Sequence, residues 1–240
     1  MKLDLNCDLG EGEPLQRTRA LMRCVTSANV ACGGHAGDLK SMQDCVRLAK
    51  ESGVQLGAHP GPWSRADFGR EPVRITPQEL ELLLLQQVGA LERLAGDQNV
   101  RLHHVKLHGA LYHATEADES LALHYLAAVR KWWPRAKVFA CASGRVARIA
   151  RRCGAPVWEE AFADRRYDDR GFLVARVNPG ALLTTPSEVS QQVRGILQRK
   201  EVATLSGQSL RMEPQTLCLH SDTPRAVQLA QRVNEMLRED

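Results

Sequence analysis

The chain has 240 residues, of which 43% are hydrophobic and 25% charged, and its formal net charge is +4. This length suits one domain with a full core, which we expect over residues 1–240. The mild charge and the 5% of aromatic residues argue against a nucleic-acid-binding protein, which needs a basic stripe with stacking rings. The sequence has no apolar run long enough to span a membrane.

The cysteines and the N-terminal residues indicate the compartment. Seven cysteines, an odd number, are scattered without Cys-x-x-Cys spacing, which indicates reduced thiols rather than a disulfide framework. The opening residues MKLDLNCDLG become acidic where a signal peptide would be apolar. We therefore expect a cytoplasmic protein.

In the first half of the chain, apolar runs that predict strands alternate with amphipathic stretches. The stretch 39–52 has apolar residues at helical spacing, follows the capping residue Asp38 and ends at Gly53. The sequence TPQE at 76–79 is a capping box with proline at the first helical position, so a second helix begins there. The first four strands are expected at 2–7, 25–30, 54–58 and 102–107.

The second half of the chain continues the alternation. A second capping box, TPSE at 185–188, predicts another helix start, and 200–214, with Gly207 at its centre, resembles a small hairpin. Further helices are expected near 118–132, 144–153 and 223–238, and further strands at 137–141, 155–159, 172–177 and 215–219.

The regular alternation of strands and helices predicts a mainly parallel sheet. An open doubly wound sheet would concentrate its chemistry at one switch point, usually beside one glycine-rich phosphate loop. Here polar residues follow strands from the first to the last, as a ring of strands requires. We therefore expect an α/β fold in which the strands close into a single TIM-like β/α barrel.

Six polar clusters lie just past the ends of six apolar runs. They read NCDLGEGE, SANVACGGHAGD, GAHPG, HVKLHGALYH, EEAFADRRY and LCLHSD. Because the carboxyl ends of barrel strands share one face, these clusters are expected to form one pocket of an enzyme. Their ionisable members are Asp8, Glu11, His35, Asp38, His59, Lys106, His108, Asp164 and His220.

Side-chain parity places Lys106 inside the predicted barrel. Residues two apart on a strand share a face, so Val105 and Leu107 would pack on the helices while Lys106 points to the axis. A buried ammonium needs a carboxylate or an anionic ligand. We therefore predict a close contact between Lys106 and a carboxylate, with Asp8 or Glu11 as the natural partner.

Several other polar residues have a simpler explanation than function. Asp38 is as well placed to cap a helix as to take part in catalysis. Ser143 and Gly144 follow a strand and open a helix, so their amides could hold an anion, although most such turns only cap. Packing, surface or subunit contacts are expected for His103, His113, His124, Trp132 and Trp133.

In their order and content, the six clusters resemble the LamB/YcsF family, which includes the A subunit of prokaryotic 5-oxoprolinase. The resemblance covers nearly the whole chain. It implies a distorted β/α barrel of the glycoside hydrolase and deacetylase type. It also implies ATP-dependent opening of the small molecule 5-oxoproline to L-glutamate, performed with separate B and C subunits. Because the chain has no Gly-x-x-x-x-Gly-Lys-Ser loop, ATP is expected to be handled mainly by those partners.

The family's motifs and the chemistry of lactam opening assign roles to particular residues. Asp8 or Glu11 could act as base, and His59 or His108 could carry protons. Lys106 could bind an anion. Together with Asp164 these five are the expected catalytic residues, and the expected substrate-binding residues are Asn29, Arg70, Tyr112, Glu160, Arg165 and His220.

A divalent metal is a second possibility for the same pocket. His35 and His59 with Asp8 offer two imidazoles and a carboxylate, a set that suits such a cation and that related deacetylases use. Hydrogen bonding among buried polar residues would explain the same three residues without a metal.

The chain departs from the family pattern where loops would shape the pocket. An aromatic residue is replaced by Gly34, a proline by Leu107, a glycine by Ser221 and the second of two arginines by Glu71. Two other functions therefore stay open: a metal-dependent hydrolase or deacetylase acting alone, and a non-catalytic ligand-binding protein. The state of assembly, including a homo-oligomer, also stays open.

Overall fold

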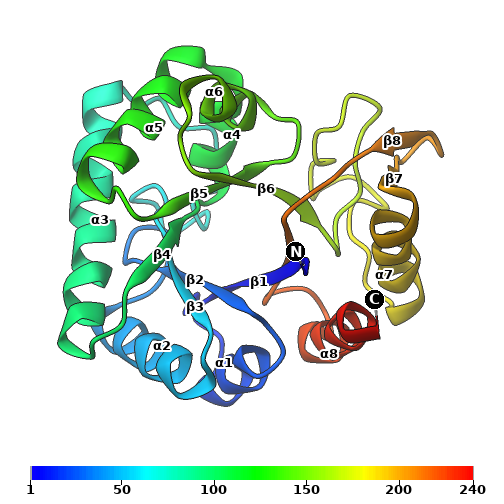
Figure 1. Ribbon diagram of the computed structural model, residues 1–240, viewed down its shortest axis with the longest axis horizontal. Helices are drawn as coiled ribbons and strands as arrows, with labels where there is room; N and C mark the ends of the chain where they lie inside the picture. The colour runs from blue at the N-terminus through cyan, green and yellow to red at the C-terminus, as the bar shows by residue number, and fades with distance from the viewer. Residues whose placement is uncertain (1, 240) are drawn as a thin grey trace.

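The computed structural model describes residues 2–239, so residues 1 and 240 of the expected domain lie outside the described residues. Its central feature is a closed barrel of parallel strands in the order β1-β2-β3-β4-β5-β6-β9, surrounded by helices (Figure 1). The first and last strands meet, because β1 pairs with both β2 and β9. The barrel strands are β1 (Asp4–Leu9), β2 (Ser27–Ala31), β3 (Gln55–His59), β4 (Leu102–Val105), β5 (Lys137–Cys141), β6 (Val157–Phe162) and β9 (Thr216–His220).

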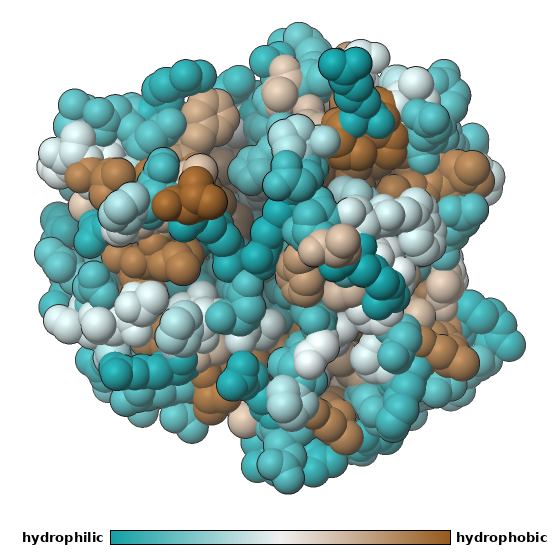
Figure 2. Space-filling model, turned by 180° about the vertical axis from the view of Figure 1, so that it is seen from behind, coloured by the Kyte–Doolittle hydropathy of each residue, from teal (hydrophilic) through white to brown (hydrophobic). Residues whose placement is uncertain are grey.

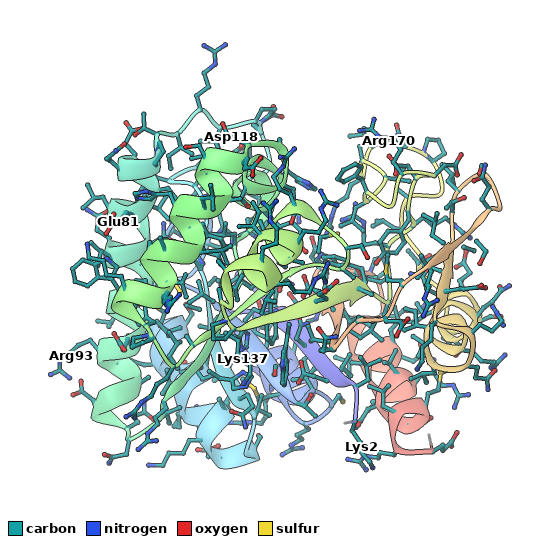
Figure 3. The ribbon with its side chains drawn as sticks, turned by 45° about the horizontal axis from the view of Figure 1, so that its top comes forward. Lys2, Glu81, Arg93, Asp118, Lys137 and Arg170 are labelled. Carbon is teal, nitrogen blue, oxygen red and sulfur yellow. The ribbon has the colours of Figure 1, made fainter. Side chains whose placement is uncertain are left out.

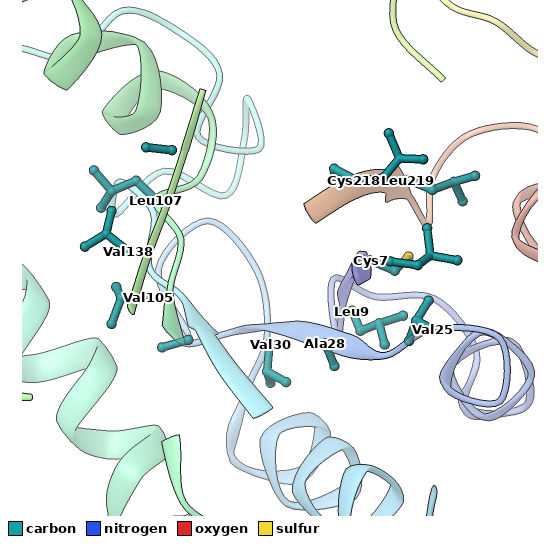
Figure 4. Packing of buried hydrophobic residues seen from close by; sticks show 14 of the residues in the cluster. Cys7, Leu9, Val25, Ala28, Val30, Val105, Leu107, Val138, Cys218 and Leu219 are labelled. Carbon is teal, nitrogen blue, oxygen red and sulfur yellow. The ribbon is translucent and has the colours of Figure 1, made fainter. Parts of the chain in front are cut away.

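Helices cover the outside of the barrel and bury the outward face of each strand. Parity decides which side chains face them: Leu5, Cys7 and Leu9 point outward on β1 and are fully buried. Figure 4 shows Ala28 and Val30 pointing from β2 toward the neighbouring helix. The helices are α1 (Leu15–Met22), α2 (Leu39–Ser52), α3 (Pro77–Asp97), α4 (Gly109–Ala117), α5 (Glu119–Trp132), α6 (Arg145–Cys153), α7 (Pro186–Arg194) and α8 (Ala226–Glu239).

The predicted helix starts are confirmed with their capping geometry. Asp38 accepts a hydrogen bond from the backbone N–H of Ser41 at 2.8 Å, and α2 ends at Gly53 in the left-handed conformation. Thr76 and Thr185 begin α3 and α7 with complete capping boxes. Each cap satisfies backbone N–H groups that the helix itself leaves free.

The prediction of a strand at 172–177 is wrong. Within residues 2–239, seven strands close the barrel. The segment 172–177 lies in an excursion between β6 and β9 and forms an isolated bridge, between Leu173 and Tyr167, instead of a strand. Its residues are largely apolar, but Val177 is 90% exposed and only Val174 is buried. The β6 strand instead pairs directly with β9.

The same excursion contains the predicted hairpin. A short π-helix (Gly195–Arg199) continues α7 and leads into it. The strands β7 (Glu201–Ala203) and β8 (Ser209–Arg211) are antiparallel, with Gly207 at φ +89° in the turn between them. The hairpin lies beside α7, outside the barrel wall (Figure 1).

Figure 3 shows the two ends of the barrel. Lys2, which precedes β1, and Lys137, which begins β5, lie at one end. Asp118 and Arg170 lie at the other. Figure 2 shows the face behind the view of Figure 1, where small apolar groups are interspersed with polar side chains. Among residues 2–239, every helix is too short or too polar to cross a bilayer.

Candidate active site

A buried charged network fills the barrel near the carboxyl ends of its strands. The Lys106 ammonium lies 2.9 Å from an Asp8 carboxylate oxygen and 3.0 Å from an oxygen of Glu160. All three side chains are almost completely buried. The predicted contact between Lys106 and a carboxylate is thus confirmed with Asp8, while the second partner is Glu160 rather than Glu11.

Hydrogen bonds from neighbouring strands hold this network in one arrangement. The Asn29 amide donates to Asp8 Oδ1 and to Asn6 Oδ1, both at 2.7 Å. The Asn6 amide in turn donates to Glu160 Oε1 at 2.9 Å. Burial alone would raise the pKa of Asp8, but its contacts with His59 and the Lys106 ammonium hold it well below its usual range. Burial instead raises the pKa of Glu160.

Three imidazoles surround the carboxylate of Glu11 at the mouth of the barrel. Glu11 Oε1 lies 3.0 Å from His35 Nε2, 3.4 Å from His108 Nδ1 and 3.7 Å from His59 Nε2. The rings of His35 and His108 stack with centroids 3.5 Å apart. Burial lowers the pKa of His35 to about 4, while the contacts of Glu11 with His108 and His35 outweigh burial and lower the pKa of Glu11. Glu11 is therefore a charged acceptor.

The loop that carries Glu11 is fixed by a neighbouring carboxylate. Glu13 accepts hydrogen bonds from the backbone N–H groups of Gly10 at 2.8 Å and Glu11 at 2.9 Å. Gly10 has φ +74°, a conformation that favours glycine, so the chain turns sharply after β1. The turn brings Glu11 back over the axis of the barrel.

A second histidine–carboxylate pair lies on the other side of Asp8. Asp164 Oδ1 is 2.9 Å from His220 Nδ1, and Asp164 also accepts from the hydroxyl of Thr223. This leaves His220 Nε2 facing Asp8 Oδ2 at 4.0 Å. Burial would raise the pKa of Asp164, but its contacts with His220 and Thr223 lower it. Asp164 is fully buried, whereas the side chain of His220 is 13% exposed.

The remaining predicted binding residues line the edge of this centre. The Tyr112 hydroxyl donates to Glu160 Oε2 at 3.3 Å. Arg165 is buried and donates to the Val174 carbonyl, but its Nε has no partner among residues 2–239. Burial and the nearby Arg176 lower the pKa of Arg165 to about 10.

Arg70 lies farther out, at the rim of the pocket. Its guanidinium is 2.6 Å from Asp222, which Arg176 also contacts at 2.9 Å. A surface cleft lined by Glu11, Phe68, Arg70 and Asp222, among others, opens here. Of the predicted site residues, Arg70 is the one least involved in the buried centre.

Two participants were missed by sequence reasoning, although parity could have found one of them, Cys218, which alternates with outward apolar residues on β9. A further participant, His104, shares the inward face of its strand with Lys106. Cys218 Sγ lies 3.0 Å from the Lys106 ammonium, and His104 Nε2 lies 2.6 Å from Asn29 Oδ1. Phe68, whose carbonyl contacts His108 Nε2 at 2.9 Å, comes from a loop that no periodicity describes.

Other polar residues have structural roles. Asp38 caps α2 at the surface, away from the buried centre. The anion site considered at Ser143 and Gly144 is already filled, because Ser143 N–H donates to Glu159 and the backbone N–H of Arg145 donates to Glu116. His103 contacts Lys137, His124 contacts Glu81, Trp133 is buried and Trp132 donates to Glu81.

Residues 3–240 match the LamB/YcsF family. The chain belongs to that family. It is similar to the A subunit of 5-oxoprolinase from Pyrococcus furiosus, with 40% identity over 243 residues that cover 100% of this chain and 95% of the relative. The LamB/YcsF motifs predicted from the sequence therefore include the residues that meet in the buried centre.

Solved structures give the same fold. The lactam utilization protein from Thermus thermophilus is 35% identical and superimposes with a TM-score of 0.90, covering 100% of this chain and 97% of that one. A family 4 carbohydrate esterase from Streptomyces lividans, only 10% identical, has a TM-score of 0.50 over 99% of this chain and 88% of its own. The second likeness concerns the fold alone and agrees with the expected TIM-like β/α barrel.

One departure from the family pattern has a physical reason in the structure. A side chain at Gly34 would place its Cβ 2.5 Å from the amide of Gln87 and 2.5 Å from the carbonyl oxygen of Gly61. Gln87 uses that amide to hold Gly61, donating to its carbonyl at 2.7 Å and accepting from its N–H at 3.0 Å. Gln87 and the Gly61 carbonyl therefore occupy the space that a side chain at position 34 would need.

Proposed function

We propose that this chain is the A subunit of an ATP-dependent 5-oxoprolinase, which opens 5-oxoproline to L-glutamate together with B and C subunits. The observation that supports this most is the buried centre of carboxylates, imidazoles and Lys106, formed by family motifs in a chain 40% identical to the A subunit of a 5-oxoprolinase. Its free cysteines suit a cytoplasmic enzyme.

Lactam opening makes three demands on such a site. The amide is stabilised by resonance, so its oxygen must be activated, a water must lose a proton, and the leaving nitrogen must gain one. ATP supplies the phosphoryl group that activates the amide oxygen. The chain itself must bind the ring, place the water and transfer the proton.

His220 is the group best placed to transfer the proton. Asp164 accepts the Nδ1–H of His220, which fixes the tautomer and leaves the Nε2 lone pair directed toward Asp8. Its side chain is 13% exposed, more than that of His35, His59 or His108. His220 Nε2 can take a proton from water and then give it to the ring nitrogen, while Asp164 stabilises the imidazolium between the two transfers.

Lys106 is better described as a positioning residue than as an anion binder. Its ammonium already contacts Asp8, Glu160 and Cys218, and its side chain is 3% exposed. It therefore fixes the Asp8 carboxylate, whose second oxygen faces His59 and His220. Because Asp8 keeps a lowered pKa, it orients a water as a charged acceptor.

Arg165 fits the anionic part of a substrate. It is buried, it is one residue from Asp164, and its Nε lacks a partner within residues 2–239, so a donor is available. A guanidinium binds carboxylate or phosphate oxygens through such donors. Arg70 and Arg176 are less available because both contact Asp222. We assign Arg165 to the substrate carboxylate or to a phosphate of ATP.

The test is reconstitution of glutamate release. The purified chain is mixed with candidate B and C subunits, 5-oxoproline and ATP, and released glutamate and ADP are measured together. We expect equal amounts of both products from the complete mixture and none when ATP or one of the subunits is omitted. Release of glutamate by this chain alone, without ATP, would contradict the proposal and favour an independent hydrolase. No release from any complete mixture would favour a binding protein.

The matched variants are two histidine substitutions. His220→Gln should strongly slow release, whereas His124→Gln, on the outer surface beside Glu81, should leave it unchanged. Full turnover in His220→Gln would remove His220 from the mechanism.

A further inference from the structure

The hydrogen bonds of two imidazoles at the barrel mouth leave their lone pairs facing each other. His59 Nδ1 lies 2.8 Å from the Lys106 carbonyl, and His108 Nε2 lies 2.9 Å from the Phe68 carbonyl. A carbonyl oxygen accepts, so each of these nitrogens carries a hydrogen. The other two nitrogens, His59 Nε2 and His108 Nδ1, are then both acceptors, and they lie 3.0 Å apart.

A third acceptor points to the same place. Glu11 Oε1 lies 3.4 Å from His108 Nδ1 and 3.7 Å from His59 Nε2. These atoms, together with one from His35, all lie within 4.8 Å of one another. Three buried acceptors repel one another unless a cation lies among them. A proton bridges only two of them, whereas a metal ion contacts all three.

We propose that Glu11, His59 and His108 form a site for one divalent transition-metal ion, bound through Glu11 Oε1, His59 Nε2 and His108 Nδ1. Donor atoms about 2.1 Å from such an ion are about 3.0–3.4 Å apart, and the three separations here are close to that spacing. Two imidazoles and one carboxylate are a typical set for a site with an open position. The backbone carbonyls on the far nitrogens are the support that metal-binding histidines use.

His35 supports the site without binding the ion. Its Nδ1 has no partner among the residues that the structure describes and lies against the backbone of Gly61. A buried N–H without an acceptor is rarer than a buried acceptor without a donor, so the hydrogen of His35 lies on Nε2. That N–H donates to Glu11 Oε1 at 3.0 Å. Of the sequence-based set of His35, His59 and Asp8, only His59 belongs to the proposed donor set, and Asp8 Oδ2 lies 3.5 Å from His59 Nε2.

The test measures metal binding directly, so it does not depend on the proposed function. The chain is treated with a chelator, dialysed and titrated with Co²⁺ and with Zn²⁺, followed by calorimetry, elemental analysis and visible absorption of the cobalt form. We expect one equivalent of either ion and a cobalt spectrum of low coordination number. An isolated wild-type chain that binds neither ion, with folding verified by circular dichroism, would overturn the proposal and leave a shared proton between His59 and His108.

Variants separate ligands from supporting residues. Each of the variants Glu11→Gln, His59→Gln and His108→Gln should lose the one bound equivalent of metal ion. Each should keep the circular dichroism spectrum of the folded chain. His35→Gln should still bind one equivalent, about 10- to 100-fold more weakly, because it removes only the support of Glu11. His124→Gln, beside Glu81 and away from the buried centre, is the matched control and should bind as the wild type does. Unchanged binding in His108→Gln, or complete loss in His124→Gln, would contradict the assignment.

Discussion

Lys106, directly after β4, and Glu160, in β6, approach to 3.0 Å inside the barrel, although β5 separates their strands and both side chains are almost completely buried. With Asp8 they form a buried triad in which the Lys106 ammonium contacts both carboxylates. Removing the ammonium would leave two buried carboxylates without a counter-charge.

Lys106→Met is therefore expected to lower the free energy of unfolding by about 3–5 kcal/mol. Urea denaturation followed by circular dichroism measures the change. Lys131→Met, which breaks an exposed contact with Glu81, is the control and should have little effect. Equal stability of the two variants would mean that the triad does not hold the barrel together.

The sequence predicted this triad in outline because strand parity depends only on alternation. Val105 and Leu107 are apolar, so Lys106 between them faces the axis whatever the details of the fold. Parity does not state which strand faces which across the barrel, so the second partner, Glu160, was assigned to substrate instead. The same alternation on β9 would have placed Cys218 and His220 together inside.

The failure at 172–177 has a different origin. Its apolar residues satisfy a strand pattern locally, but a strand needs a neighbour with free backbone groups. The edges of β6 and β9 are already paired with each other. Likewise Phe68 and Arg70 reach the site from an irregular loop, where the sequence carries no periodicity to interpret.

His220→Gln should reduce kcat of the assembled enzyme by about 10²- to 10⁴-fold, the usual effect of losing a proton-transfer group. KM should change much less, because the contact is made in the reaction and not in binding. Steady-state rates with excess partner subunits give both constants. A rise in KM with unchanged kcat would instead return His220 to the substrate-binding role.

Gly57→Ala should distort the barrel interior. A Cβ at this position would lie 1.9 Å from His104 Nε2, the atom that contacts Asn29. His104 is stacked on Phe139 and has little freedom to move, so we expect a loss of about 1–3 kcal/mol. Thermal denaturation measures it. Gly89→Ala in α3, where the Cβ meets no atom within 4 Å, should be neutral or stabilising.

Arg165→Lys should weaken binding of one anionic substrate. The change keeps the charge but removes the guanidinium donors, so KM for 5-oxoproline or for ATP should rise by about 10- to 100-fold. The substrate whose KM responds identifies the anion. Arg166→Lys, a half-exposed neighbour that is 4.0 Å from Glu188, is the control. If neither KM changes in Arg165→Lys, Arg165 has a structural role and does not bind a substrate.

Asp164 should contribute to acid sensitivity. Its pKa is lowered in the folded protein, so its charged form adds stability above the ordinary aspartate value of about 3.9. That contribution is lost as the pH falls through the lowered value. The difference in unfolding free energy between wild type and Asp164→Asn should therefore be largest near neutral pH and shrink below about pH 4. A difference that stays constant from about pH 6 to about pH 3 would contradict this.

The closure of the barrel between β1 and β9 has a consequence for biosynthesis. The hydroxyl of Thr216 meets the carboxylate of Asp4 across 212 positions of the chain. One backbone edge of β1 consequently has no partner until nearly the whole polypeptide has left the ribosome. Contacts this distant in sequence form slowly, and an open strand edge invites pairing with other chains. Truncation that removes β9 and α8 should for this reason produce aggregates during translation rather than a smaller folded enzyme.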